Sequence, residues 1–592
     1  GALAAAVVVG LSYGWARPLL GRWGAWLLAA LIALDPFYLA LSRVLGHDAP
    51  VSACMWLSLL AFLRAIDEPP AGPTRITSRT VFLSLSGACG GLAFLSKYPA
   101  LFIGAFVALT MLVVYLRQPA PLRSPLPASR LTSALACWLR DIALWSIVAG
   151  LVVVILWPVM WVDPLRPVMT VIDDALRASG SAHPKGSFFL GRPVADPGAL
   201  FYPLVILLRT TPVVFFGLLL SLWLLLRRRL SHSGLEQTSL ILLAYIILYT
   251  LLVTYGGKKQ DRYILPAFPA IVMLASLGYT HLLASLPALR RSPPFAAPRF
   301  SWIIPVALIL LQTAFIFPYY PYYFTYYNPL AGGGQAAAKT LQVGWGEGLN
   351  EAAAYLNSLP GVESTRVTAW YSTTFEPYYH GQAIYKLEDE KISRSAKPGL
   401  AADYVVFYIN QTQRRLPSEG ALQYFQATTP VYTVTINGLD YAWIYPSVGL
   451  DYVFPDEVRL VGQAELLGYN LTSEAGRPVE SAYPESVVLL SLFWEWQGKS
   501  NDDPIRLSLI DAAGRTRGWG NPVETVAPLP FEAWPEGMVA QDRFALVIFP
   551  DTPPGEYQLS AWIERPATHE TVGVFPLNGE AAIPIVPRND EP

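Results

Sequence analysis

Long apolar runs separated by short polar stretches dominate the first 320 residues of the chain. A helix needs about 20 mostly apolar residues to cross the hydrocarbon core of a membrane, and about ten runs of that kind occur here. Their approximate limits are 1–15, 24–43, 49–65, 80–96, 99–116, 141–157, 204–226, 238–255, 263–284 and 302–318. The pattern therefore predicts a polytopic α-helical membrane domain over residues 1–318.

The basic residues between these runs predict the orientation of the helices. Lysine and arginine are concentrated in every second loop, for example in 227–229 and 290–299, and the positive-inside rule places such loops in the cytoplasm. The alternate loops, including 158–203 and 256–262, then lie outside, as does everything after Pro318. We expect a multi-pass protein of the cell membrane whose C-terminal domains are extracytoplasmic.

The period of the apolar pattern changes after residue 318. Helix-like segments such as GLNEAAAYLN alternate with strand-like segments such as DYVVFYI over residues 319–449, which predicts a small extracytoplasmic α/β domain. Beyond residue 450, apolar and polar residues alternate with a period of two, as in IRLSLI and YQLSAWI. This alternation is typical of half-buried antiparallel strands and predicts a β-sandwich over residues 450–592.

Composition agrees with a membrane protein and excludes other classes. Hydrophobic residues make up 53% of the 592 residues and charged residues only 14%, too apolar a balance for one soluble domain. The formal net charge of -1 leaves no basic field for nucleic acid. The three cysteines, Cys54, Cys89 and Cys137, form no CxxC pair, so neither a disulfide framework nor a cysteine metal site is expected.

Ionisable and aromatic polar residues gather at the ends of the runs that are predicted to face outward. Charged groups against a membrane span are costly unless they have a partner or a function. The group comprises His47, Asp48, Lys97, Tyr98, His183, Lys185, Arg209, Lys258, Lys259, Asp261, Arg262 and Tyr263. Its cations suit a phosphate or pyrophosphate attached to a lipid whose tail stays in the bilayer.

Simpler explanations exist for several of these residues. Asp48 could merely cap the helix that follows it, since Asp before Ala-Pro is a common helix start. Lys97 could snorkel from a helix end to the lipid headgroups. His183 could be an ordinary surface histidine. The segment 258–262 could be no more than a charged turn, although the positive-inside rule disfavours three cations in a short outer turn.

Four motifs in a fixed order resemble a known family. They are SRVLGHDAP at the outer start of a span, GGLAFLSKYPALF, a long outer loop leading to ALFYPLVILLRTTP, and KKQDRYILPAFPA. Together they make residues 1–318 similar to the GT-C glycosyltransferases, and within these to the dolichyl-phosphate-mannose protein mannosyltransferases and the bacterial aminoarabinose transferases. The resemblance implies a GT-C-like membrane fold and transfer of a sugar from a lipid-phosphate carrier.

The resemblance also implies roles for individual residues. Asp48 matches the second acidic position of the family, near the acceptor or carrier, and is the catalytic candidate. Lys97, beside Tyr98, matches the lysine that faces the carrier phosphate, and Arg262–Tyr263 match an RY motif that helps to hold it. His183 lies in a loop where some relatives place a histidine of a metal site. The family's leading catalytic carboxylate follows its first span, and we expect that loop to precede Gly1.

These observations predict an inverting glycosyltransferase that uses a polyprenyl-phosphate-linked sugar, a hexose or a pentose, on the extracytoplasmic face. Lys97, Tyr98, Lys258, Lys259, Arg262 and Tyr263 are the predicted carrier-phosphate site. The acceptor, whether protein, lipid or glycan, is not specified by the sequence. No cofactor is certain, and the resemblance suggests only a divalent metal, with His183 as a candidate ligand. A transporter or flippase of lipid-linked sugars, or a non-catalytic glycan-binding membrane protein, remains as an alternative.

Overall fold

The computed structural model describes residues 2–68, 77–117, 127–180, 186–229, 235–285, 302–386, 395–454, 459–460, 464–479, 481–497, 505–565, 570–576 and 582–586. The chain divides into two compact units, Gly1–Gln342 and Val343–Pro592. The first unit is almost entirely helical and the second contains both larger sheets. The expected class, a polytopic α-helical membrane protein with an α/β domain and a β-rich C-terminal domain, is confirmed.

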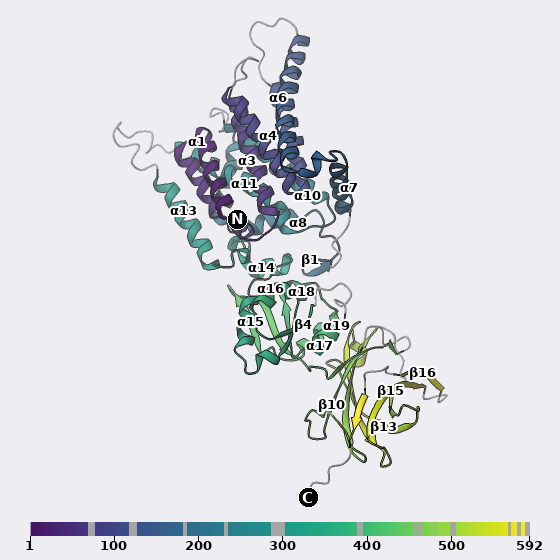
Figure 1. Ribbon diagram of the computed structural model, residues 1–592. Coiled ribbons are helices and arrows are strands. Elements are labelled where there is room, and N and C mark those ends of the chain that lie inside the picture. The colour runs from purple at the N-terminus through teal and green to yellow at the C-terminus, as the bar shows by residue number, and fades with distance from the viewer. Residues whose placement is uncertain are drawn as a thin grey trace. The chain divides into compact units, whose positions relative to one another are not determined.

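Each of the ten apolar runs falls within a helix or a pair of helices of the first unit (Figure 1). The helices are α1 (Ala2–Ala33), α2 (Pro36–Arg43), α3 (Asp48–Asp67), α4 (Ser78–Ser96), α5 (Leu101–Arg117), α6 (Pro127–Leu156), α7 (Arg166–Gly180), α8 (Phe201–Arg209), α9 (Pro212–Leu226), α10 (Leu235–Tyr255), α11 (Phe268–Ser285), α13 (Ile303–Ile316) and α14 (Gly333–Thr340). Among the described residues, six helices are long and apolar enough to span a membrane, or up to nine when each bent pair counts as one span.

Two of the expected spans are bent rather than straight, and a third bend follows the expected span 302–318. α1 and α2 meet at 53°, α8 and α9 at 117°, and the helix ending at Tyr319 meets the short turns up to Ala331 at 104°. Proline explains the first two breaks, because Pro36 and Pro212 begin new helices and cannot donate to the preceding turn. α1 is also interrupted at Gly21, whose φ of 70° is left-handed. It contains the run 1–15 and the first part of the run 24–43, which continues in α2.

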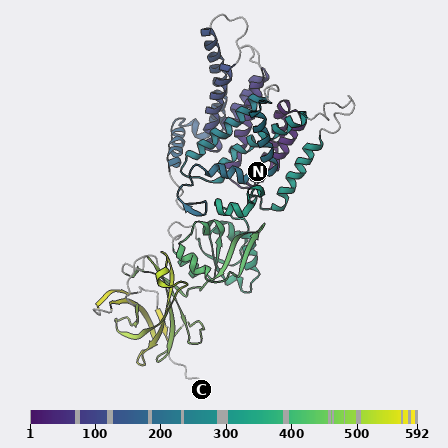
Figure 2. The ribbon, with the colours of Figure 1, turned by 180° about the vertical axis from the view of Figure 1, so that it is seen from behind.

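α3 and α11 form the centre of the helical unit. The spans beginning at Asp48 and Asp261 are 72% and 83% buried inside the protein, whereas the span 131–156 of α6 is only 11% buried. α13 stands at the edge of the helices in both views (Figures 1 and 2), where it contacts α1 and α9. A buried centre and an apolar exposed periphery are expected where lipid surrounds the helices.

The segment 319–342 clusters with the helices, although the sequence assigned it to the α/β domain. Its chain is tied to α8, because Asn328 donates to the carbonyl oxygen of Leu207 at 3.1 Å and its own backbone N–H donates to that of Leu208 at 2.7 Å. A small hairpin of β1 (Ser187–Phe189) and β2 (Arg192–Val194) also contacts this segment, through the backbone of Leu341.

The second unit begins with a five-stranded mixed sheet in the order β4-β3-β5-β7-β6. Its strands are β3 (Arg366–Ala369), β4 (Gln382–Lys386), β5 (Tyr404–Tyr408), β6 (Tyr432–Ile436) and β7 (Leu439–Pro446). Five short helices accompany it, namely α15 (Leu349–Asn357), α16 (Ser372–Phe375), α17 (Lys397–Ala401), α18 (Ile409–Gln413) and α19 (Glu419–Gln426). β3 pairs in parallel with β4 and β5, as expected where helical connections separate strands.

The remaining strands form one continuous antiparallel sheet that curls around its main core, beside which Trp534, Met538 and Ala540 form a smaller cluster. They are β8 (Tyr452–Val453), β9 (Arg459–Leu460), β10 (Ala464–Thr472), β11 (Val487–Trp496), β12 (Ile505–Ile510), β13 (Thr516–Val526), β14 (Val539–Ile548), β15 (Gly555–Arg565), β16 (Glu570–Pro576) and β17 (Ala582–Ile585). Side chains from both ends of the sheet, such as Leu466 and Leu559, share that core. The expected sandwich is therefore a folded-over single sheet.

Candidate functional site

Asp48 and two cations from separate helix ends form one cluster in the helical unit. The Asp48 carboxylate accepts a hydrogen bond from Lys97 Nζ at 2.6 Å through Oδ1, and lies 3.1 Å from Arg262 Nε through Oδ2. These side chains are 14%, 23% and 24% exposed, respectively. Asp48 lies in the first turn of α3, whose N-cap residue His47 makes no capping bond. Asp48 is therefore an ion-pair partner rather than the helix cap that the sequence also allowed.

The break between α4 and α5 presents Lys97 to this cluster. Pro99 cannot continue the hydrogen-bond ladder of α4, and the helix ends at Ser96. Lys97 adopts an extended backbone, with φ of -166° and ψ of 140°, before the short turn Tyr98–Ala100 begins. Burial lowers the pKa of Lys97, and the nearby cations Arg262 and Lys258 lower it further, whereas Asp48 opposes the shift. Lys97 is therefore a partly desolvated cation.

Two tyrosines and one more lysine complete the cluster. Lys97 Nζ lies 4.4 Å from the ring centroid of Tyr263, and the Arg262 guanidinium lies 5.7 Å from the same ring. Tyr98 is 39% exposed and close enough to Tyr263 to interact with it electrostatically. Lys258 is half-buried and interacts electrostatically with Lys97. No ion pair joins Lys258 to any residue that the structure describes.

The backbone that carries Arg262 is fixed by side chains of neighbouring helices. Asp261 Oδ1 accepts from the Arg262 backbone N–H at 2.8 Å, while its Oδ2 accepts from Arg209 at 2.6 Å. Tyr249 donates to the carbonyl oxygen of Tyr263 at 3.1 Å. These bonds hold the turn Asp261–Ala267 at the start of α11, so that the Arg262 side chain can meet Asp48.

Arg209 is not available to a ligand, although the sequence placed it among the cations at the outward-facing span ends. It is 1% exposed and donates to the carbonyl oxygens of Phe324 and Tyr326 as well as to Asp261. Its guanidinium also lies 4.0 Å from the ring centroid of Tyr327. Arg209 is a brace between α8 and the segment after α13.

Lys259 differs from its neighbour Lys258. It is 4% exposed and donates to Asp196 Oδ1 and to the Gly256 carbonyl oxygen, both at 2.7 Å. Burial alone would raise the pKa of Asp196. The hydrogen bonds that it accepts from Lys259 and from a backbone N–H have the larger effect, so the pKa of Asp196 is lowered. In the described part of the chain no contact joins Lys259 to Asp48, so the structure gives it a different partner from the cations of the cluster.

The predicted metal ligand His183 lies outside the described residues. Within the described ranges, no group of three or more His, Cys, Asp or Glu side chains is placed to hold a metal ion. A metal at His183 stays a prediction.

The geometry of the cluster suits an anion. Lys97, Arg262 and Lys258 supply three positive charges against one carboxylate, and partial burial strengthens their pull relative to water. An anion can add to these cations without leaving a buried charge unpaired. The ring of Tyr263 beside two of them provides an apolar wall.

The sequence did not reveal which basic residues already have a carboxylate partner. Asp196 forms an ion pair with Lys259, and Asp261 forms one with Arg209. Asp141 pairs with Arg79 at 2.9 Å within the helices. Asp261 stood in the KKQDRY motif and could have been recognised as a partner, but Asp196 lies 63 residues from Lys259.

Comparisons with known proteins agree with the motifs at the N-terminal end. Residues 1–157 match the model of a family described as dolichyl-phosphate-mannose-protein mannosyltransferase. Over those residues the match confirms the resemblance that the motifs indicated. None of the curated proteins matches the chain.

Several solved structures are distantly similar, among them the following three. The apo oligosaccharyltransferase of Archaeoglobus fulgidus is 13% identical, with a TM-score of 0.41, over 99% of this chain and 87% of that one. ArnT from Cupriavidus metallidurans, bound to undecaprenyl phosphate, is 13% identical with a TM-score of 0.35, over 75% and 82%. Arabinofuranosyltransferase AftD from Mycobacteria is 11% identical with a TM-score of 0.30, over 97% and 55%. Scores this low assign no activity.

Proposed function

We propose that this protein is a membrane glycosyltransferase that takes a sugar from a polyprenyl-phosphate carrier. The observation that carries the proposal is the meeting of Lys97 and Arg262 at Asp48, where apolar spans end. Lys258 is close enough to Lys97 to interact with it electrostatically. A lipid phosphate has its charge at the membrane surface and its tail in the hydrocarbon, so a cation cluster at a span end fits both parts. The family match over residues 1–157 supports the same class.

In the proposed reaction an acceptor hydroxyl or amine attacks the anomeric carbon of the donor sugar. The bond from that carbon to the phosphate oxygen breaks as the new bond forms on the opposite side, which inverts the anomeric centre. The oxygen that leaves gains negative charge, and Lys97 and Arg262 stabilise it. The acceptor proton passes to a base, and polyprenyl phosphate is released.

Asp48 is better suited to positioning than to proton transfer. Lys97 Nζ lies 2.6 Å from its Oδ1 and Arg262 Nε lies 3.1 Å from its Oδ2, so both carboxylate oxygens face cations rather than an acceptor group. Asp48 then holds Lys97 and Arg262 apart at a fixed spacing until a phosphate competes for them. This assignment replaces the catalytic role that the family resemblance implied for Asp48.

The cluster is proposed to lie on the extracytoplasmic face, with the domains after residue 318 on the same side. The alternation of basic loops supports this orientation. Placement outside the cytoplasm suits a lipid-linked donor, because it needs no soluble sugar nucleotide. The two sheet domains would then stand where an acceptor of the cell surface is found.

Sugar transfer by the purified protein tests the proposal against transport. The protein is reconstituted in vesicles with a labelled polyprenyl-phosphate sugar and a mixture of lipid and peptide acceptors. The expected result is label in an acceptor together with free polyprenyl phosphate, with both reduced at least ten-fold by Lys97→Met. Movement of intact donor across the bilayer without cleavage would instead support a flippase and overturn the proposal.

A further inference from the structure

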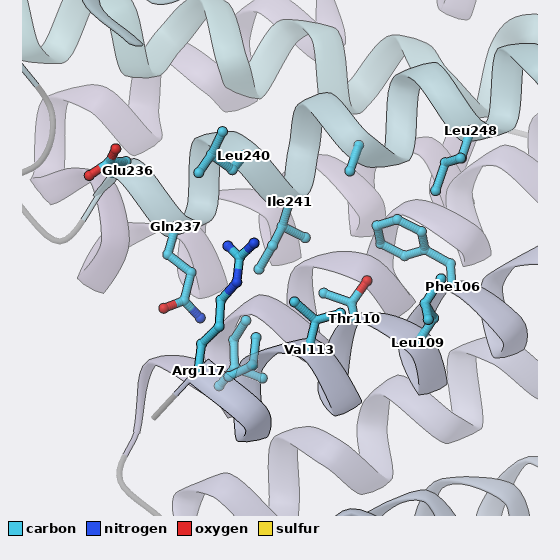
Figure 3. A pocket seen from close by; sticks show the side chains of 13 residues that line it. Phe106, Leu109, Thr110, Val113, Arg117, Glu236, Gln237, Leu240, Ile241 and Leu248 are labelled. Carbon is cyan, nitrogen blue, oxygen red and sulfur yellow. The ribbon is translucent and has the colours of Figure 1, made fainter. Parts of the chain in front are cut away.

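A groove lies between α5 and α10, away from the cation cluster described above. Its volume is about 780 Å³, within the range of about 300–1,000 Å³ that is usual for small-ligand sites. Apolar side chains of both helices line most of its length, among them Phe106, Leu109, Leu240 and Leu248 (Figure 3). Leu109 and Leu248 are 55% and 40% exposed, so the groove opens toward the lipid.

The charged residues of the groove lie at one end. They are Arg117, the last residue of α5, and Glu236 in the first turn of α10, with Gln237 next to Glu236. Thr110 also lines the groove, farther along α5. Figure 3 shows the Arg117 guanidinium turned toward α10, with Gln237 beside it and the Glu236 carboxylate at the same end. α5 has 17 residues, and at 1.5 Å per residue this end lies about 25 Å from the Lys97 end.

The two charges at this end have opposite signs. Neither Arg117 nor Glu236 forms an ion pair with a residue in the described ranges, and Arg117 is exposed. A ligand whose head carries both a negative and a positive group could satisfy both side chains, while its tail fills the apolar length of the groove. Phospholipids with a zwitterionic headgroup have this arrangement.

We propose that the groove binds a phospholipid with a primary ammonium headgroup, of the phosphatidylethanolamine class, in the leaflet opposite the Lys97 cluster. Its phosphate accepts from Arg117 and Gln237, and its ammonium donates to Glu236. An anionic lipid is disfavoured because Glu236 repels it. A choline headgroup is disfavoured because its quaternary ammonium has no N–H to donate to a carboxylate.

Lipid retention measured by native mass spectrometry tests this site. The detergent-solubilised protein is given equal amounts of phosphatidylethanolamine, phosphatidylglycerol and phosphatidylcholine. We expect phosphatidylethanolamine to be retained about three-fold to ten-fold over the others, as one or two charge-assisted contacts at a partly exposed site would give. Arg117→Gln should lower retention of all three lipids.

Glu236→Gln provides the sharper result. Removing the carboxylate should abolish the preference for the ammonium headgroup and raise phosphatidylglycerol to the level of phosphatidylethanolamine. Arg227→Gln, an exposed arginine at the end of α9, is the matched control and should leave the ratios unchanged. An unchanged lipid ratio in Glu236→Gln, or equal retention of the three lipids by the unmodified protein, would overturn the proposal.

Discussion

Replacing Arg262 by glutamine removes one of the cations that the proposed carrier phosphate contacts. The Arg262 side chain is 24% exposed, and the Asp48 carboxylate that it pairs with is 14% exposed, so water screens the contact only partly. A charge-assisted hydrogen bond in such a setting contributes about 1.5–3 kcal/mol. In the variant, the negative charge of Asp48 is balanced by Lys97 only. This weakens the attraction of Lys97 for the phosphate.

This free energy corresponds to about a ten-fold to hundred-fold loss of affinity. Binding of undecaprenyl phosphate to the reconstituted protein is measured by competition with a labelled lipid phosphate. Arg262→Lys, which keeps the charge but loses the planar fork, should recover part of the affinity. Arg227→Gln should bind as tightly as the unmodified protein.

The thermal unfolding of each variant is followed in parallel, because Arg262 also makes an ion pair in the ligand-free protein. An Arg262→Gln variant that unfolds normally and binds within two-fold of the unmodified protein would refute the assignment of this cluster to the carrier phosphate.

Four further predictions concern the cluster, the topology and the C-terminal unit. Asp48→Asn should tighten binding of polyprenyl phosphate, because the carboxylate no longer competes for the cations; unchanged affinity with lost turnover would instead make Asp48 the base. Burial lowers the pKa of Lys97, so binding of polyprenyl phosphate should weaken with rising pH before an ordinary lysine loses its proton. In the same pH series, Lys97→Arg should not show this loss of binding. A cysteine at Ser447 should react with an impermeant reagent on intact cells and one at Ser231 should not; the reverse pattern would invert the topology. Burial, with an opposing glutamate on the neighbouring strand, raises the pKa of Glu495 to about 8. The contribution of Glu495 to the stability of the C-terminal unit should therefore be greatest below its unfolded pKa of about 4.5 and be lost as the pH rises to about 8. Urea titrations at several pH values should show this loss in the unmodified protein and not in Glu495→Gln.

The positions of the spans could be predicted because lipid imposes a length and a polarity on every helix that crosses it. All ten apolar runs lie in helices, yet the bends were not predicted. The run 204–226 is apolar on both sides of its break. The chain bends by 117° at this break, between the buried Arg209 and Pro212. The sequence signal for this bend is the short segment RTTP, and an average of hydropathy over a window of about 20 residues conceals it.

The candidate site could be predicted only in part, because span ends identify the membrane face but not the partner. Lys97 and Arg262 meet Asp48, each from the end of a different span. Lys258 and Lys259 are adjacent and chemically identical, and only the fold reveals that Asp196 binds the second of them. The family motifs could not separate these two residues, since long-range ion pairs depend on loops whose course the sequence does not specify.

A structure of the protein with bound polyprenyl phosphate would locate the carrier directly. We expect phosphate oxygens within hydrogen-bond distance of Lys97 Nζ and the Arg262 guanidinium, with Lys258 nearby and Lys259 still bound to Asp196. A phosphate held elsewhere, with the Asp48 ion pairs to Lys97 and Arg262 intact and no lipid against them, would contradict it.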